Sequence, residues 1–172
     1  MKRFVNIALS GSVVAQILIL VGMYVLAVLP LWTGKEVKLK TIPVDPRSMF
    51  RGNYARLNYG ISQIDASHFP QDKDLRNGEV VYVVLMPDGE ELFVFSKIML
   101  NKPATGVFLR GRIQNRHYEN KTSYYRVNYG IEAFFAPREQ ALKLEQQLRD
   151  GGIALLMVSD GGKARLKDLT GF

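Results

Sequence analysis

The hydrophobic pattern divides the chain into two parts. Residues 4–34 carry no charged side chain, and Val13–Trp32 is almost wholly apolar. A helix rises about 1.5 Å per residue, so roughly 20 apolar residues cross the hydrocarbon core of a bilayer. The pattern therefore predicts a transmembrane helix. We divide the chain into a cytoplasmic tip and anchor, residues 1–34, and a separate domain, residues 35–172.

After the anchor, apolar and polar residues alternate with the two-residue period of strands. Glu79–Met86 is a near-continuous apolar run, which predicts a central strand buried on both faces. Pro87-Asp88-Gly89 predicts a hairpin turn into Glu91–Ile98, and the polar segment Asp65–Gly78 predicts a loop with a helical turn. The other predicted strands are Glu36–Ile42, Tyr54–Ile61, Val107–Ile113, Tyr124–Ile131, Ile153–Val158 and Lys163–Leu169.

A single segment of the domain has the pattern of a soluble helix. Pro137 suits the first helical position, Glu139 follows in the first turn, and an apolar stripe continues to Leu148. Asp150-Gly151-Gly152 ends the helix. The predicted fold is a single N-terminal transmembrane helix followed by a β-rich α+β domain, with mainly antiparallel strands and one amphipathic helix near the C-terminus.

The N-terminal segment has two interpretations. Lys2 and Arg3 precede the apolar run, as in a signal peptide, and Val25–Ala27 resembles a cleavage site. Cleavage there would leave the apolar Val28–Trp32 at the new N-terminus, and the run exceeds the h-region of a usual signal peptide, about 7–15 residues. We therefore expect an uncleaved anchor. Short basic tails stay in the cytoplasm, so the domain is expected to be extracytoplasmic, periplasmic in a bacterium, with residues 4–34 in membrane lipid.

Composition limits the chemistry of the domain. The basic residues, 23 in the chain against 16 acidic ones, are scattered without a block, so we expect no nucleic-acid partner. The absence of cysteine excludes disulfides, thiolate zinc sites and a cysteine nucleophile. His68 and His117 lie far apart in polar surroundings, and the sequence contains no phosphate-binding glycine loop. We therefore expect neither a metal nor a cofactor.

One strand motif occurs twice. Tyr54–Ile61 reads YARLNYGI and Tyr124–Ile131 reads YYRVNYGI, so six of eight positions are identical at an offset of 70 residues. Alternation would put the apolar side chains of each copy on one face and Tyr, Arg and Asn on the other. Two interpretations stay open. In the first, both strands pack their apolar side chains in the same way, and their polar faces are simply exposed to solvent. In the second, the polar faces lie together as a binding surface, because Tyr and Arg are enriched in protein interfaces.

The first copy follows the most distinctive segment of the chain, Asp45–Tyr59. The residues Gly52, Tyr54, Leu57 and Tyr59, preceded by Asp45-Pro46-Arg47, resemble the motif that gives the GDYxxLxY family its name. Asn53 replaces the aspartate of the motif, which removes the charge that a metal ligand or a general base would need.

The resemblance implies a membrane-anchored bacterial envelope protein, often associated with multi-pass membrane proteins. We therefore expect a non-catalytic module that binds an envelope or integral membrane protein. Its predicted contact residues are Asp45, Arg47, Arg51, Gly52, Asn53, Tyr54, Arg56, Asn58 and Tyr59.

A catalytic alternative rests on a resemblance to signal peptidase I, another anchored, β-rich protein. Ser48-Met49 resembles its nucleophile dipeptide, and Lys97 follows at about the distance of its general base. This chemistry requires a lysine amine kept unprotonated by burial. The alternative is thus a membrane-bound Ser48/Lys97 hydrolase, and it predicts that Lys97 is buried beside Ser48.

Overall fold

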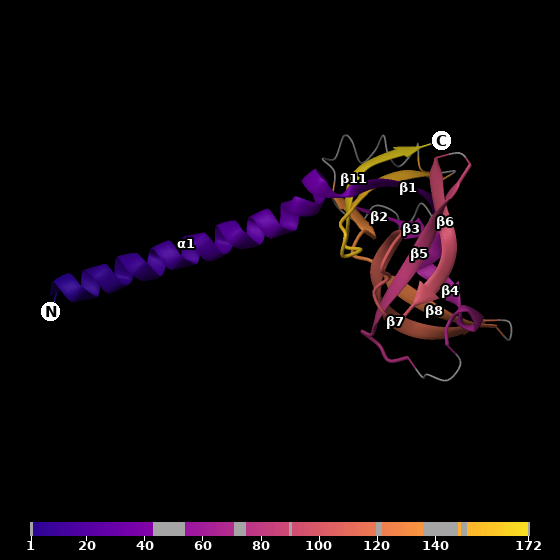
Figure 1. Cartoon of the computed structure of the whole chain (residues 1–172), viewed down its shortest axis with the longest axis horizontal. Helices are drawn as coiled ribbons and strands as arrows, with labels where there is room; N and C mark the ends of the chain where they lie inside the picture. The colour runs from indigo at the N-terminus through magenta and orange to yellow at the C-terminus, as the bar shows by residue number, and fades with distance from the viewer. Residues whose placement is uncertain are drawn as a thin grey trace.

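The computed structural model describes residues 2–42, 54–70, 75–89, 91–119, 122–135, 148 and 151–171. A single long helix, α1 (Lys2–Thr33), precedes a β-rich domain (Figure 1). The strands are β1 (Lys35–Ile42), β2 (Tyr54–Arg56), β3 (Asn58–Tyr59), β4 (Gln63–Asp65), β5 (Val80–Asp88), β6 (Leu92–Met99), β7 (Val107–Glu119), β8 (Thr122–Asn128), β9 (Ala133–Phe135), β10 (Gly152–Val158) and β11 (Ala164–Gly171). Two short 3-10 helices, η1 (Gly60–Ser62) and η2 (Ala66–His68), complete the described elements.

Helix α1 is long and apolar enough to cross a membrane. Its segment Leu9–Thr33 has a mean hydropathy of 2.5, and no part of it is buried against the domain. The helix extends away from the domain and meets β10 and β11 near its C-terminal end (Figure 1). The Thr33 hydroxyl donates to the Leu29 carbonyl at 3.1 Å, which satisfies one of the carbonyls that the end of a helix leaves free.

The strands form a nine-stranded, mostly antiparallel sheet in the order β11-β10-β1-β6-β5-β7-β8-β4. β3 pairs with β1 through Thr41 and Ile42, while β4 pairs with β8. Because residues 58–65 carry both β3 and β4, this short segment connects β1 to the far end of the sheet. The sheet consequently curves back on itself around one core (Figure 1).

Most of the predicted strands are confirmed. β5 lies between β6 and β7 as the predicted central strand, and the Pro87–Gly89 hairpin joins it to β6. Burial on both faces of β5 is wrong, however. Val81, Val83 and Leu85 are buried, whereas the alternate residues are only half-buried, because one face of the sheet is open.

Two further expectations need correction. The single strand predicted over Tyr54–Ile61 is broken at Leu57, because β2 pairs with β9 in a separate two-stranded sheet while β3 pairs with β1. The short strands β4 and β9 were not expected, since three-residue strands carry too little periodicity to be recognised. The predicted helix Pro137–Leu148 lies outside the described residues except for Leu148.

Candidate binding surface

The two copies of the repeated motif contact each other in the core through reciprocal hydrogen bonds. The Tyr59 hydroxyl donates to the Ile131 carbonyl at 2.9 Å, and the Tyr129 hydroxyl donates to the Ile61 carbonyl at 2.7 Å. Each tyrosine of one copy therefore bonds the isoleucine of the other at equivalent positions. This is the contact expected across a two-fold axis inside a single chain.

The backbone pairing follows the same symmetry. In the first copy, Arg56 pairs with Ala133 of β9, and in the second, Arg126 pairs with Gln63 of β4. The two pairs are equivalent, because Arg126 lies 70 residues after Arg56 and Ala133 lies 70 residues after Gln63. Each copy thus forms an antiparallel pair with the segment that follows the other copy, so neither is complete without its counterpart.

The turns after the two tyrosines are also equivalent. The Tyr59 amide donates to the Ser62 hydroxyl at 3.3 Å, and the Tyr129 amide donates to the Glu132 carboxylate at 2.6 Å. The second Glu132 oxygen accepts the Gly130 amide at 2.9 Å. A side chain three residues along therefore closes each turn, and Glu132 does so with two bonds.

Alternation of the repeated strands is confirmed. The apolar side of each copy is buried, with Tyr59 only 2 % exposed and Tyr129 7 %. Burial raises the pKa of both phenols well above its usual value, and the nearby Glu132 carboxylate contributes. The other buried members of this side are Leu57, Ile61, Tyr125, Val127 and Ile131. Tyr59 therefore belongs to the core rather than to the exposed contact predicted for it.

The polar side of the second copy lies on the open face of the sheet. Directly opposed residues of antiparallel strands share a face. Asn128 is opposite Arg112 of β7, and Arg126 is opposite Asn115. Tyr82 of β5 is opposite Arg110. The polar residues of the second copy therefore join two exposed arginines of β7 on one surface.

An open depression of about 790 Å³ lies on this face. The Arg112 guanidinium donates to the Gly78 carbonyl at 2.7 Å, and the Arg110 amide donates to the Gly162 carbonyl at 2.7 Å, which ties β7 to the β10–β11 turn. As far as the structure describes the lining, its ionisable groups are cationic apart from the buried Tyr129. The polar and cationic lining residues are Asn77, Arg110, Arg112, Gln114, Asn115, Asn128 and Lys163.

We call the exposed side chains of Arg110, Arg112, Asn115 and Lys163, together with the half-buried side chains of Arg126 and Asn128, the basic face. Guanidinium groups bind carboxylates and phosphates in a bidentate manner, and amides donate and accept alongside them. The basic face therefore suits an acidic group on a partner. Its strand β7 was predicted, but its convergence with the second repeat depends on sheet order, which the sequence pattern does not give.

Of the remaining predicted contact residues, the structure describes only three, Tyr54, Arg56 and Asn58. Arg56 is exposed on β2 and Asn58 is half-buried on β3. The side chain of Tyr54 is not described, although its backbone pairs with Phe135. The predicted contact residues Asp45, Arg47, Arg51, Gly52 and Asn53 lie outside the described residues. The polar side of the first copy is therefore only partly placed.

The catalytic alternative finds no support from its lysine. Lys97 is exposed on β6, whereas the Ser/Lys mechanism requires a buried amine. Ser48 lies outside the described residues. His68 packs edge-on against Phe95 with ring centroids 5.0 Å apart, and His117 of β7 is opposite Tyr124 of β8. Both histidines thus occupy separate, exposed positions.

Comparison with known proteins identifies one family. The sequence model described as GDYXXLXY protein matches residues 16–169, which is most of the chain. The match begins inside α1 and ends in β11, so it covers the helix and the β-rich domain together. Neither the curated proteins nor the solved structures contain a significant match.

Proposed function

We propose that this chain, which belongs to the GDYXXLXY family, is a membrane-anchored, non-catalytic module that binds an envelope or integral membrane protein. The observation that carries this proposal is the junction between helix and domain. α1 ends at Thr33 and β1 begins at Lys35, with Gly34 alone between them. A helix that spans a bilayer would therefore hold the domain directly against the membrane surface.

The length of α1 supports this placement. Leu9–Thr33 has 25 residues, which at about 1.5 Å per residue gives roughly 37 Å, enough to cross a hydrocarbon core of about 30 Å. A domain joined through one residue reaches only partners at the same surface. A membrane protein, or an envelope protein that approaches the membrane, is therefore the class of partner that we propose.

We place the domain outside the cytoplasm, in the periplasm of a bacterium, because Lys2 and Arg3 precede the apolar run. The chain contains no cysteine, so a single introduced thiol is a clean reporter. In intact cells, an Asp88→Cys variant in the exposed β5–β6 turn should react with a membrane-impermeant maleimide that enters the periplasm. A cysteine after Met1 should react only after lysis. The reverse pattern would place the domain in the cytoplasm.

We propose two parts of the contact surface. One is the predicted segment from Asp45 to Asn58, with Arg51, Tyr54 and Arg56; the buried Tyr59 supports it from the core. The other is the basic face, whose cations and amides suit an acidic group on the partner. The two parts consist of different residues, so each can be changed alone.

The binding test is co-purification of the full-length protein from membranes in mild detergent. Arg51/Tyr54/Arg56→Ala tests the predicted segment, and Arg110/Arg112→Ala tests the basic face. Lys97/Lys167→Ala, at two other exposed positions, is the control. We expect a stoichiometric partner with wild type and control, and its loss in at least one test variant that still folds by circular dichroism. A partner retained by every folded variant would refute both contact assignments, and no partner at all would refute the binding function.

The C-terminal helix remains part of our proposed fold. We propose that residues 137–148 form the amphipathic helix that the pattern predicts. Leu148, the last residue of the apolar stripe, is 3 % exposed. The Gly151 amide donates to the Leu148 carbonyl at 3.0 Å, and Gly151 has a φ of 98°. A glycine with left-handed backbone angles, whose amide bonds a carbonyl three residues earlier, is typical of the position just after the end of a helix. Gly151 therefore supports a helix that ends near Leu148.

A further inference from the structure

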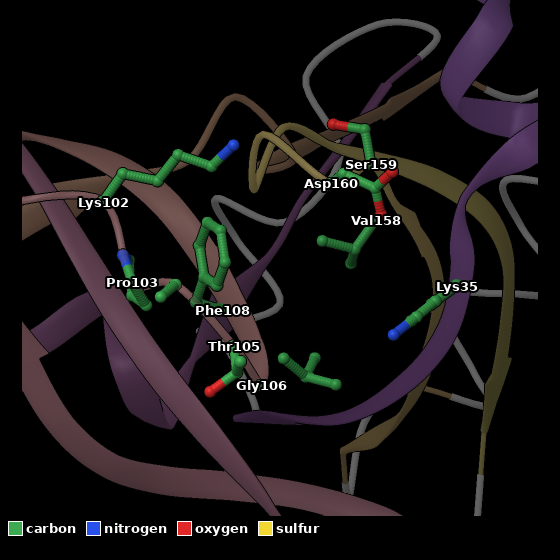
Figure 2. A pocket seen from close by; sticks show the side chains of 11 residues that line it. Lys35, Lys102, Pro103, Thr105, Gly106, Phe108, Val158, Ser159 and Asp160 are labelled. Atoms are coloured by element: carbon green, nitrogen blue, oxygen red, sulfur yellow. The ribbon is translucent and has the colours of Figure 1, made fainter.

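A second depression, of about 570 Å³, lies beside the junction of α1 and β1 (Figure 2). Lys35 of β1 lines it directly, and its backbone partner Val158 leads into Ser159 and Asp160 on the same rim. The β6–β7 connection forms the opposite rim. The lining residues are Lys35, Lys102, Pro103, Ala104, Thr105, Gly106, Val107, Phe108, Val158, Ser159 and Asp160.

The position of this depression follows from α1. Lys35 is two residues beyond Thr33, the last residue of the helix. Strand residues advance about 3.3 Å each, and the polar layer of one leaflet is about 5 to 7 Å deep. Trp32, 70 % exposed, is an aromatic of the kind that lies at the membrane interface. With α1 in a bilayer, the Lys35 rim therefore lies at the depth of the lipid headgroups.

The chemistry of the lining suits a phosphate attached to an apolar group. Lys35 and Lys102 extend their ammonium groups over the depression from two sides (Figure 2). Among the described residues, neither ammonium has an ion-pair partner. The Thr105 hydroxyl lies on the rim, and Phe108 and Val158 provide an apolar floor. Asp160 is the acidic lining residue, so cations outnumber it two to one.

We propose that this depression binds the headgroup phosphate of an anionic phospholipid, with Lys35 and Lys102 as the phosphate ligands. The proposal rests on the membrane anchoring in the proposed function, since that anchoring brings the headgroups to the site. It adds a specific lipid contact to the non-specific solvation of α1. Such a contact would hold the Lys35 side of the domain against the headgroups, because the helix and its one-residue junction alone leave the tilt of the domain relative to the membrane plane unrestrained.

The test is lipid retention by the full-length protein, measured by native mass spectrometry in mild detergent. The protein is titrated with phosphatidylglycerol and, separately, with phosphatidylcholine. We expect wild type to retain phosphatidylglycerol preferentially and K35E/K102E to lose that preference by about tenfold or more, since each lysine near an anionic surface contributes roughly 1 kcal/mol. The charge-matched control K97E/K167E should retain it, and D160N should tighten it.

Three outcomes would overturn the proposal. They are equal retention of both lipids by wild type, unchanged preference in a folded K35E/K102E variant, and displacement of the lipid by excess inorganic phosphate, which would indicate a site for a soluble anion. Membrane anchoring is scored separately by alkaline extraction of wild-type membranes. Release of the protein by that treatment would refute the anchor itself, whereas retention with no lipid preference would refute only the headgroup site.

Discussion

Two tyrosine hydroxyls join the repeated segments in the interior of the domain. Tyr59 and Tyr129 each donate to a carbonyl of the other copy, and both side chains are buried. A buried carbonyl that loses its donor retains its desolvation penalty. The tyrosine that closes the GDYxxLxY motif is therefore explained by packing and hydrogen bonding, without a ligand.

We predict that Tyr129→Phe lowers the free energy of unfolding by about 1–3 kcal/mol, because it leaves the Ile61 carbonyl without its donor. Tyr59→Phe should cost a similar amount. The control is Tyr82→Phe on the half-buried side of β5, where the ring packs edge-on against Phe108. Thermal unfolding of the full-length protein in detergent measures all three. Equal stability of Tyr129→Phe and Tyr82→Phe would contradict the role of the hydroxyl.

The raised pKa values of these phenols predict alkaline unfolding. An unfolded tyrosine ionises near pH 10, whereas Tyr59 and Tyr129 stay protonated in the folded state at higher pH. Their contribution to stability is therefore complete below about pH 10 and is lost as the pH rises further. The loss is at most about 1.4 kcal/mol per pH unit for each tyrosine. Urea titrations from pH 8 to 11, of wild type and of the double Phe variant, measure the difference in slope. Parallel slopes would contradict it.

The elements around the repeat show what pattern alone could predict. The alternation of apolar and polar residues correctly predicts which side of each repeated strand is buried. The continuous apolar run of Glu79–Met86 correctly predicts β5 as a central strand. The pattern did not show that β2 and β3 have different partners, because pairing depends on residues far away in the sequence. The two-fold relation was visible as an eight-residue repeat, but its partner strands β4 and β9 were too short to recognise.

The candidate surfaces were less predictable than the strands. Arg56 and Asn58 were identified from the motif, but Arg110 and Arg112 looked like ordinary solvated residues of a strand. They gain significance because sheet order places β7 beside β8 and the β10–β11 turn beside β7. The headgroup depression likewise joins three segments distant in sequence.

The two turn glycines of the repeat are not equivalent, and this gives a matched test. Gly130 has a φ of 80°, whereas Gly60 begins η1 and has no positive φ. A Cβ at either position meets no atom within 4 Å. Gly130→Ala should therefore cost about 1–2 kcal/mol from backbone strain alone, and Gly60→Ala should cost much less. Differential scanning calorimetry of both variants distinguishes the positions, and equal costs would show that this turn can relax.

For the whole molecule, the short connection at Gly34 makes membrane distance part of the proposed mechanism. A ten-residue Gly/Ser linker inserted after Gly34 would let the domain move roughly 17 Å from the end of α1, using about 5–6 Å times the square root of the residue number. The domain should remain folded, because the insertion precedes β1. The local concentration of the domain at a membrane-embedded partner would fall, so recovery of that partner should decrease several-fold.

The same linker inserted after Gly89, in the exposed β5–β6 turn, is the control, since it adds equal length without moving the domain from the membrane. Co-purification and the unfolding temperature are measured for both insertions. Reduced recovery with the Gly34 insertion alone would show that the partner is met at the membrane surface. Equal recovery with both would show that the partner reaches the domain from solution, in which case the one-residue junction serves to orient the domain and not to bring it close.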